Sequence, residues 1–120
     1  MEFSTLPEFD REFGNLLKRY PSLREDLELL KQFLAVSPRG HQPGVFRISG
    51  LGISTEVYKV KHFRCKALRH GSRSGIRVIY AFFEKEQKIV FTEIFYKEKD
   101  DQDCDRKRIL KNYRHNPSTR

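Results

Sequence analysis

The spacing of apolar residues changes once along this 120-residue chain, from a helical period to a strand period at Val57. Two apolar stripes at helical spacing come first: Phe9, Phe13, Leu16, Leu17 and Tyr20 in one, and Leu23, Leu27, Leu30 and Leu34 in the other. Such stripes bury one side of a helix against a core. Pro21 ends the first helix, and the very short break before the second predicts an antiparallel helical hairpin.

The start of each predicted helix has the spacing of a capping box. Thr5 and Glu8 stand three apart before the first helix, and Ser22 and Glu25 stand three apart before the second. In a capping box the hydroxyl accepts a hydrogen bond from a free backbone N–H of the first turn. We therefore expect both helices to be capped by these side chains. Residues 1–4 carry a weaker pattern that indicates a short first strand.

Beyond Val57 the sequence predicts strands. Residues 76–83 and 88–96 are rich in β-branched and aromatic side chains, and polar residues 84–87 make a turn between them. Together with the alternating residues 57–62, these segments predict an antiparallel meander. A short strand is also expected over 45–48, and a last helix over 106–113 follows the acidic residues 100–105.

This order of elements predicts an α+β fold. An N-terminal antiparallel helical hairpin packs on a small, mostly antiparallel sheet, and a short C-terminal helix completes the chain. We expect one domain over residues 1–113 and a flexible tail over residues 114–120.

The charge of the chain indicates its class of partner. The formal net charge is +8, which on a small domain favours a polyanion such as nucleic acid. Cys65 and Cys104 have neither CxxC spacing nor a histidine cluster, so we expect free thiols in a reducing compartment and no zinc site. No apolar run reaches the roughly 20 residues that span a bilayer, and the N-terminus lacks a signal-peptide pattern. The expected location is the cytoplasm, with no membrane contact and no cofactor.

Four basic residues of the predicted strands are candidates for a site. If the strands pair as a meander, Lys59, Lys61, Arg77 and Lys97 converge on one concave face. Such a cluster suits RNA cleavage, in which a 2′-hydroxyl attacks the adjacent phosphate and the phosphate oxygens gain charge. Arg77 is the first choice for the phosphate, because a guanidinium binds it through two hydrogen bonds. The residues alone equally allow a basic groove that binds nucleic acid without cutting it.

Short segments then resemble the RelE/ParE toxin superfamily. They are Tyr58-Lys59-Val60-Lys61, Ser74-Gly75-Ile76-Arg77-Val78-Ile79-Tyr80, Ile89-Val90-Phe91 leading to Tyr96-Lys97-Glu98-Lys99, and Lys107-Arg108-Ile109-Leu110. The resemblance implies a RelE-like fold and a microbial type II toxin–antitoxin module. RelE-type members cleave mRNA, commonly on the ribosome and without metal, by means of basic residues.

The resemblance also implies residue roles. Lys59 and Lys61 match the paired strand lysines of the active site, Arg77 matches the arginine at the scissile phosphate, and Lys97 matches a second basic residue. The C-terminal tyrosine of the best-known members has no counterpart, and Asp103 or a neighbour falls near its place. Tyr96 or His70 is the hypothetical substitute. Further RNA contacts are expected from the loop and strand-end cations Arg64, Lys66, Arg69, Arg73 and Lys99.

Three functions fit this pattern. The first is a ribonuclease toxin, held silent by an antitoxin whose acidic amphipathic segment covers the basic face. The second is a ParE-like inhibitor of DNA gyrase, which would not need a cationic RNA site. The third is a catalytically degenerate protein that binds only RNA or an antitoxin.

Overall fold

The structure is a computed structural model that describes residues 1–40, 44–61, 63, 65–68, 75–97 and 103–114. In chain order its elements are β1 (Glu2–Thr5), α1 (Pro7–Arg19), α2 (Leu23–Val36), β2 (Val45–Arg47), β3 (Glu56–Val60), the short 3-10 helix η1 (Lys66–Leu68), β4 (Ile76–Phe83), β5 (Lys88–Tyr96) and α3 (Arg106–Tyr113). None of the described helices is long and apolar enough to cross a membrane.

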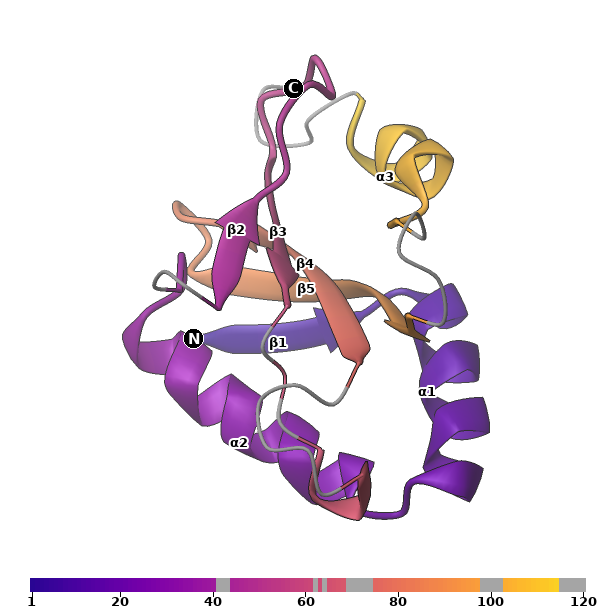
Figure 1. The fold of residues 1–120 in the computed structure, drawn as a ribbon. Coiled ribbons are helices and arrows are strands. Elements are labelled where there is room, and N and C mark those ends of the chain that lie inside the picture. The colour runs from indigo at the N-terminus through magenta and orange to yellow at the C-terminus, as the bar shows by residue number, and fades with distance from the viewer. Residues whose placement is uncertain (41–43, 62, 64, 69–74, 98–102, 115–120) are drawn as a thin grey trace.

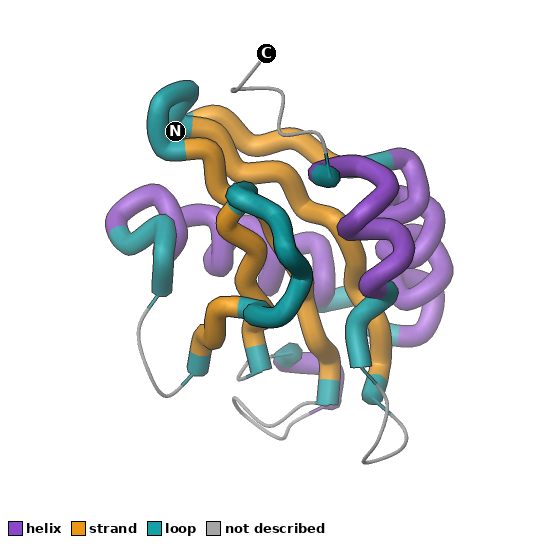
Figure 2. The backbone as a smooth tube through the Cα atoms, turned by 90° about the horizontal axis from the view of Figure 1, so that it is seen from above, coloured by secondary structure: helices purple, strands orange, loops and turns teal. Residues whose placement is uncertain are grey.

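The strands form one five-stranded sheet in the order β1-β5-β4-β3-β2 (Figure 1). β1 pairs with β5 in parallel, and the other three pairs are antiparallel. Helices α1 and α2 cover one face of this sheet, whereas α3 and the segment after β2 lie over the other (Figures 1 and 2). The predicted α+β fold with a helical hairpin, a mostly antiparallel sheet and a C-terminal helix is therefore confirmed.

Each face of the sheet has its own hydrophobic core. On the hairpin face, Phe9 of α1 stacks on Phe91 of β5 with ring centroids 5.5 Å apart, and Tyr58 stacks on Tyr80 at 5.3 Å. On the α3 face, Ile79 of β4 packs in a cluster with Ile109 and other residues. Because β4 is buried on both faces, its sequence is a nearly continuous apolar run. Both cysteines are free, as predicted, and both are buried.

The two predicted capping boxes are wrong. Thr5 belongs to β1, where it pairs with Phe91, and Leu6 stands before α1 without a side-chain cap. Ser22 does precede α2, but its backbone is already helical and its hydroxyl caps no N–H of that helix. The hydroxyl instead donates to Asp26 at 2.8 Å and accepts the N–H of Ala67 at 2.9 Å. Ser22 thus fastens the start of α2 to η1.

Arg108 fastens α3 to the hairpin side of the molecule. Its guanidinium donates to both carboxylate oxygens of Glu12 in α1 at 2.9 Å, and to the carbonyl of Thr92 in β5 at 2.9 Å. The Arg108 side chain is only 13% exposed, so little water screens these contacts.

We expect Arg108→Ala to lower the free energy of unfolding by about 2–3 kcal/mol, because hydrogen bonds between charged groups would be lost and the Glu12 carboxylate would keep only the N–H of Ile94 as a partner. Chemical denaturation measures this change. Lys107→Ala, at an exposed position of the same helix, is the matched control. Equal midpoints for the two variants would contradict the assigned role of Arg108.

An ion pair joins the turn after α2 to the sheet and makes stability depend on pH. Arg39 donates to the two carboxylate oxygens of Glu56 at 2.7 and 2.9 Å. These hydrogen bonds lower the pKa of Glu56 below its ordinary 4.5, against the opposing effect of burial. A lowered pKa means that the contribution of Glu56 is fully present above pH 4.5 and is lost as the pH falls through the lower folded value.

Wild-type protein is therefore expected to lose stability between neutral and acidic pH more steeply than Glu56→Gln. Thermal melts across that range measure the difference. Glu86→Gln, in the exposed turn before β5, should keep the wild-type slope. An unchanged slope in Glu56→Gln would refute the role of this carboxylate.

Candidate nucleic-acid interface

The candidate cations meet on the α3 face, at the end of the sheet where β4 begins. Lys59 of β3 pairs with Ile79 of β4, and Arg77 pairs with Phe95 of β5. Paired residues of antiparallel strands point to the same face. Since Ile79 and Phe95 belong to the core beneath α3, Lys59 and Arg77 share that face.

A register shift in β5 decides which neighbouring residues join them. The pairing passes from Ile79–Glu93 to Tyr80–Phe91, so β5 has one extra residue at this point. Without the shift, strict alternation from Phe91 would place Tyr96 on the α3 side of the sheet and Lys97 on the hairpin side. With it, Lys97 follows Phe95 onto the face of Arg77, and its N–H donates to the carbonyl of Gly75 at 2.8 Å.

A polar cavity of about 230 Å³ opens beside these residues. We call it the basic groove; its lining residues are Phe46, Arg47, Ile48, Ser49, Lys59, Lys61, Asp103 and Arg106. They come from β2 and the segment after it, from β3, and from the start of α3. Arg47 pairs with Tyr58, which belongs to the core under the hairpin, so strand alternation directs the Arg47 side chain away from Lys59.

Arg77 has no acidic partner among the residues that the structure describes. Its Nη1 donates to the backbone carbonyls of Lys61 at 3.0 Å and Ile76 at 3.4 Å. Burial lowers the pKa of Arg77, yet a guanidinium keeps its proton at neutral pH. Its charge is thus anchored by neutral acceptors, an arrangement that suits an incoming anion.

Lys59 of β3 and Lys61, which follows the end of β3, have different partners. Lys59 Nζ lies 3.1 Å from Asp103 Oδ1, whereas Lys61 Nζ lies 5.3 Å from the centre of the Phe46 ring. A cation over an aromatic face keeps its charge available to other groups. The groove therefore combines basic side chains with an aromatic ring, as surfaces that bind single-stranded nucleic acid do.

The structure does not bring every expected residue to the groove. The Tyr96 ring stacks on Tyr20 of the hairpin with centroids 6.2 Å apart, on the face opposite Arg77. Lys66 Nζ lies 3.3 Å from Glu25 of α2, so this lysine borders the hairpin. The structure therefore places the Tyr96 and Lys66 side chains away from the groove. His70, Arg64, Arg69, Arg73 and Lys99 lie outside the described residues.

Sequence reasoning overlooked Phe46 and Arg106, and named Asp103 only by its place near the missing tyrosine. The alternation of 45–47 marks one face of a strand, but the partner of Phe46 follows only from the β2–β3 register. In the sequence, nothing distinguishes Arg106 from the other basic residues of the same charged helix. Its position depends on how α3 lies over the sheet, and no local pattern records that.

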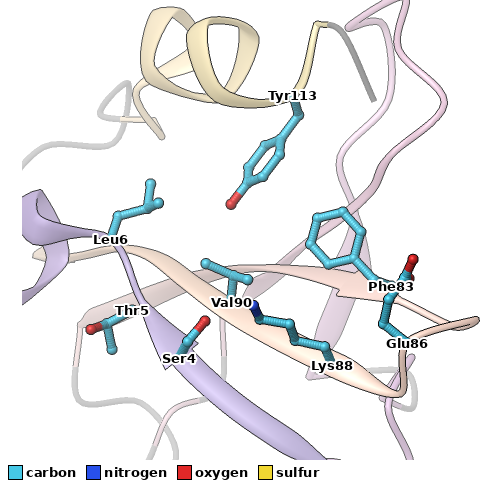
Figure 3. Close-up of a pocket in the computed structure, with 8 residues that line it drawn as sticks. All are labelled: Ser4, Thr5, Leu6, Phe83, Glu86, Lys88, Val90 and Tyr113. Atoms are coloured by element: carbon cyan, nitrogen blue, oxygen red, sulfur yellow. The ribbon is translucent and has the colours of Figure 1, made fainter. Parts of the chain in front are cut away.

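A larger cavity of about 400 Å³ lies at the opposite end of the same face, near the end of α3 (Figure 3). Its lining residues are Ser4, Thr5, Leu6, Phe83, Glu86, Lys88, Val90 and Tyr113. The Tyr113 side chain extends from α3 toward the strands (Figure 3), and its hydroxyl lies 3.3 Å from Thr92 Oγ1. The basic residue of this lining, Lys88, is paired with Glu2 at 3.7 Å. This cavity is mainly apolar and fits a polyanion less well than the basic groove.

Comparison with solved structures identifies the fold of this chain. A chain in the crystal structure of the archaeal RelE–RelB complex from Pyrococcus horikoshii OT3 superposes with a TM-score of 0.56, covering 82% of this chain and 96% of that one. This chain has the RelE-like fold. The two sequences are 15% identical, so the RelE-like likeness is one of fold. No protein-family model and no curated protein matches the sequence.

Proposed function

We propose that this RelE-like chain is the toxin of a type II toxin–antitoxin pair and an endoribonuclease that cleaves mRNA on the ribosome. The observation that carries the proposal is the placement of Lys59 and Arg77 on one face of the sheet, with Lys61 lining the same groove as Lys59. Strand alternation adds Lys97 to that face. Cytoplasmic location follows from the proposed substrate.

In the proposed reaction the 2′-hydroxyl of one nucleotide loses its proton and attacks the following phosphorus. The bond to the 5′-oxygen breaks and that oxygen takes up a proton, which leaves a 2′,3′-cyclic phosphate and a 5′-hydroxyl. Negative charge grows on the non-bridging oxygens, and fixed cations that are already in place stabilise it. Arg77 takes the scissile phosphate in this proposal, since its guanidinium has no competing carboxylate among the described residues. Lys59 in β3 and Lys61 just after it add positive charge, and so does Lys97, which follows β5.

The proposed antitoxin has the opposite charge. The net charge of +8 and the cations that line the groove favour an acidic segment as the partner. A RelE-like fold that was crystallised together with RelB supports a protein partner for this chain too. We further propose that residues 1–113 form the toxin domain, with residues 114–120 as its tail.

Incubation of the purified protein with mRNA in stalled ribosome complexes tests the activity. New RNA 5′ ends within the occupied codon are expected. They should be absent from a control reaction without the protein. A parallel incubation with DNA gyrase and supercoiled plasmid distinguishes the second class of function. DNA breaks without RNA ends would replace the proposal by gyrase poisoning, and neither product would indicate a protein that only binds.

A further inference from the structure

Asp103 occupies the basic groove between two cations. Its Oδ1 lies 3.1 Å from Lys59 Nζ, and its Oδ2 lies 3.6 Å from an Nη of Arg106. All three side chains line the same cavity of about 230 Å³. Each carboxylate oxygen therefore faces a different positive group, which is also how two non-bridging phosphate oxygens would be bound.

Asp103 is ionised in this position. Burial alone would raise its pKa, but the N–H of Cys104 and the ammonium of Lys59 outweigh burial and hold the pKa below its ordinary value. The side chain is 42% exposed, so the contact is open to water and to competing anions. Ion pairs with this much exposure are weak, so a polyanion that also contacts the other cations of the groove can displace the carboxylate.

The two cations extend into the groove from backbone and side-chain contacts that do not involve Asp103. Lys59 extends from the central part of the β2–β3–β4 ladder, where it pairs with Phe46 and Ile79. Arg106 donates through Nη1 to the carbonyl of Ser49 at 3.2 Å, which ties its guanidinium to the segment after β2. Removing the carboxylate charge would therefore leave both positive groups at the groove.

We propose that Lys59 and Arg106 form a binding site for a phosphate of the RNA strand, and that Asp103 fills this site in the free protein. This inference rests on the proposed function and adds to it a phosphate contact and a built-in competitor. Nucleic acid binds by displacing the Asp103 carboxylate from both cations. Asp103 thereby weakens binding to any nucleic acid that does not also engage the rest of the groove.

Binding of a single-stranded 2′-deoxy oligonucleotide tests the proposal, because this probe lacks the attacking hydroxyl and cannot be cleaved. Fluorescence anisotropy is measured for wild type, Asp103→Asn and Glu28→Gln. Glu28→Gln makes the same change of charge on α2, where the exposed Glu28 pairs with Lys31. We expect Asp103→Asn to bind about fivefold more tightly or better, with a steeper salt dependence, and Glu28→Gln to stay near wild type.

A second pair of variants keeps the test independent of how Asp103→Asn folds. Arg106→Gln should bind the oligonucleotide several-fold more weakly, and its log–log salt slope should fall by about 0.7 for the one lost phosphate contact. Lys107→Gln, the next residue on α3, is the matched control. In the double variant Asp103→Asn/Arg106→Gln most of the gain should disappear.

Wild-type affinity in folded Asp103→Asn, or equal affinities for Arg106→Gln and Lys107→Gln, would overturn the phosphate site. Neither result would affect cleavage that depends on Arg77, so the proposed function would stand. Conversely, a tighter Asp103→Asn in a protein that cuts no mRNA would support the phosphate site and contradict the proposed cleavage.

Discussion

Arg77→Ala is expected to slow mRNA cleavage in ribosome complexes by about 100- to 1000-fold, the loss typical of removing one group that stabilises transition-state charge. The reason is that Arg77 lies on the same face of the sheet as Lys59 and has no carboxylate partner among the described residues. Single-turnover rates with saturating toxin measure the effect on the chemical step.

Two comparisons make this result specific. Arg77→Lys keeps a positive charge but loses the guanidinium fork, so it should recover only part of the rate. Arg24→Ala removes an exposed arginine from α2, on the other side of the sheet, and should leave the rate unchanged. Arg77→Ala should remain folded, because the lost bond to the Lys61 carbonyl is worth about 1 kcal/mol. A full rate in folded Arg77→Ala would remove Arg77 from the mechanism.

Ile79→Asp is expected to unfold the protein. Ile79 is fully buried in β4, in the core that joins the sheet to α3. A carboxylate there would lose its hydration without gaining a partner, at a cost of about 4 kcal/mol or more. That is a large share of the roughly 5–15 kcal/mol that stabilises an ordinary domain.

Circular dichroism and chemical denaturation measure this loss of structure. Lys85→Asp, in the exposed turn between β4 and β5, introduces the same side chain without burying it. This control should unfold at nearly the wild-type midpoint. A cooperative transition of wild-type stability in Ile79→Asp would contradict the assignment of Ile79 to the core.

The elements that could be predicted are those whose pattern is local. The bounds of β4, β5 and α3 agree with the predicted ranges 76–83, 88–96 and 106–113, because apolar runs and polar turns mark them directly. The helical hairpin follows from two stripes separated by Pro21. The parallel pairing of β1 with β5 could not be predicted, because it joins residues more than 80 positions apart in the sequence and leaves no local pattern.

The site was predictable only as far as strand alternation is regular. Lys59 and Lys61 are two apart in one strand, so their common side could be read from the sequence. The register shift opposite Ile79–Tyr80 could not be read from the sequence. It moves Tyr96 to the hairpin face of the sheet and Lys97 to the α3 face. The shift removes the tyrosine from the groove and adds a lysine to it.

The capping predictions at hydroxyl side chains are wrong for a related reason. Ser22 has the spacing of a cap, but the N–H of Ala67, far along the chain, uses its oxygen instead. The place of Asp103 between Lys59 and Arg106 likewise depends on α3 folding back over the sheet. Tertiary contacts of this kind override local patterns and are visible only in the folded chain.

Induced expression in growing cells, with all mRNA 5′ ends mapped for wild type and Arg77→Ala, tests the central claim most directly. The account predicts growth arrest by the wild type with new 5′ ends inside translated regions, and neither effect with Arg77→Ala. Growth arrest by the wild type without new RNA ends, or the same new ends with Arg77→Ala, would contradict it.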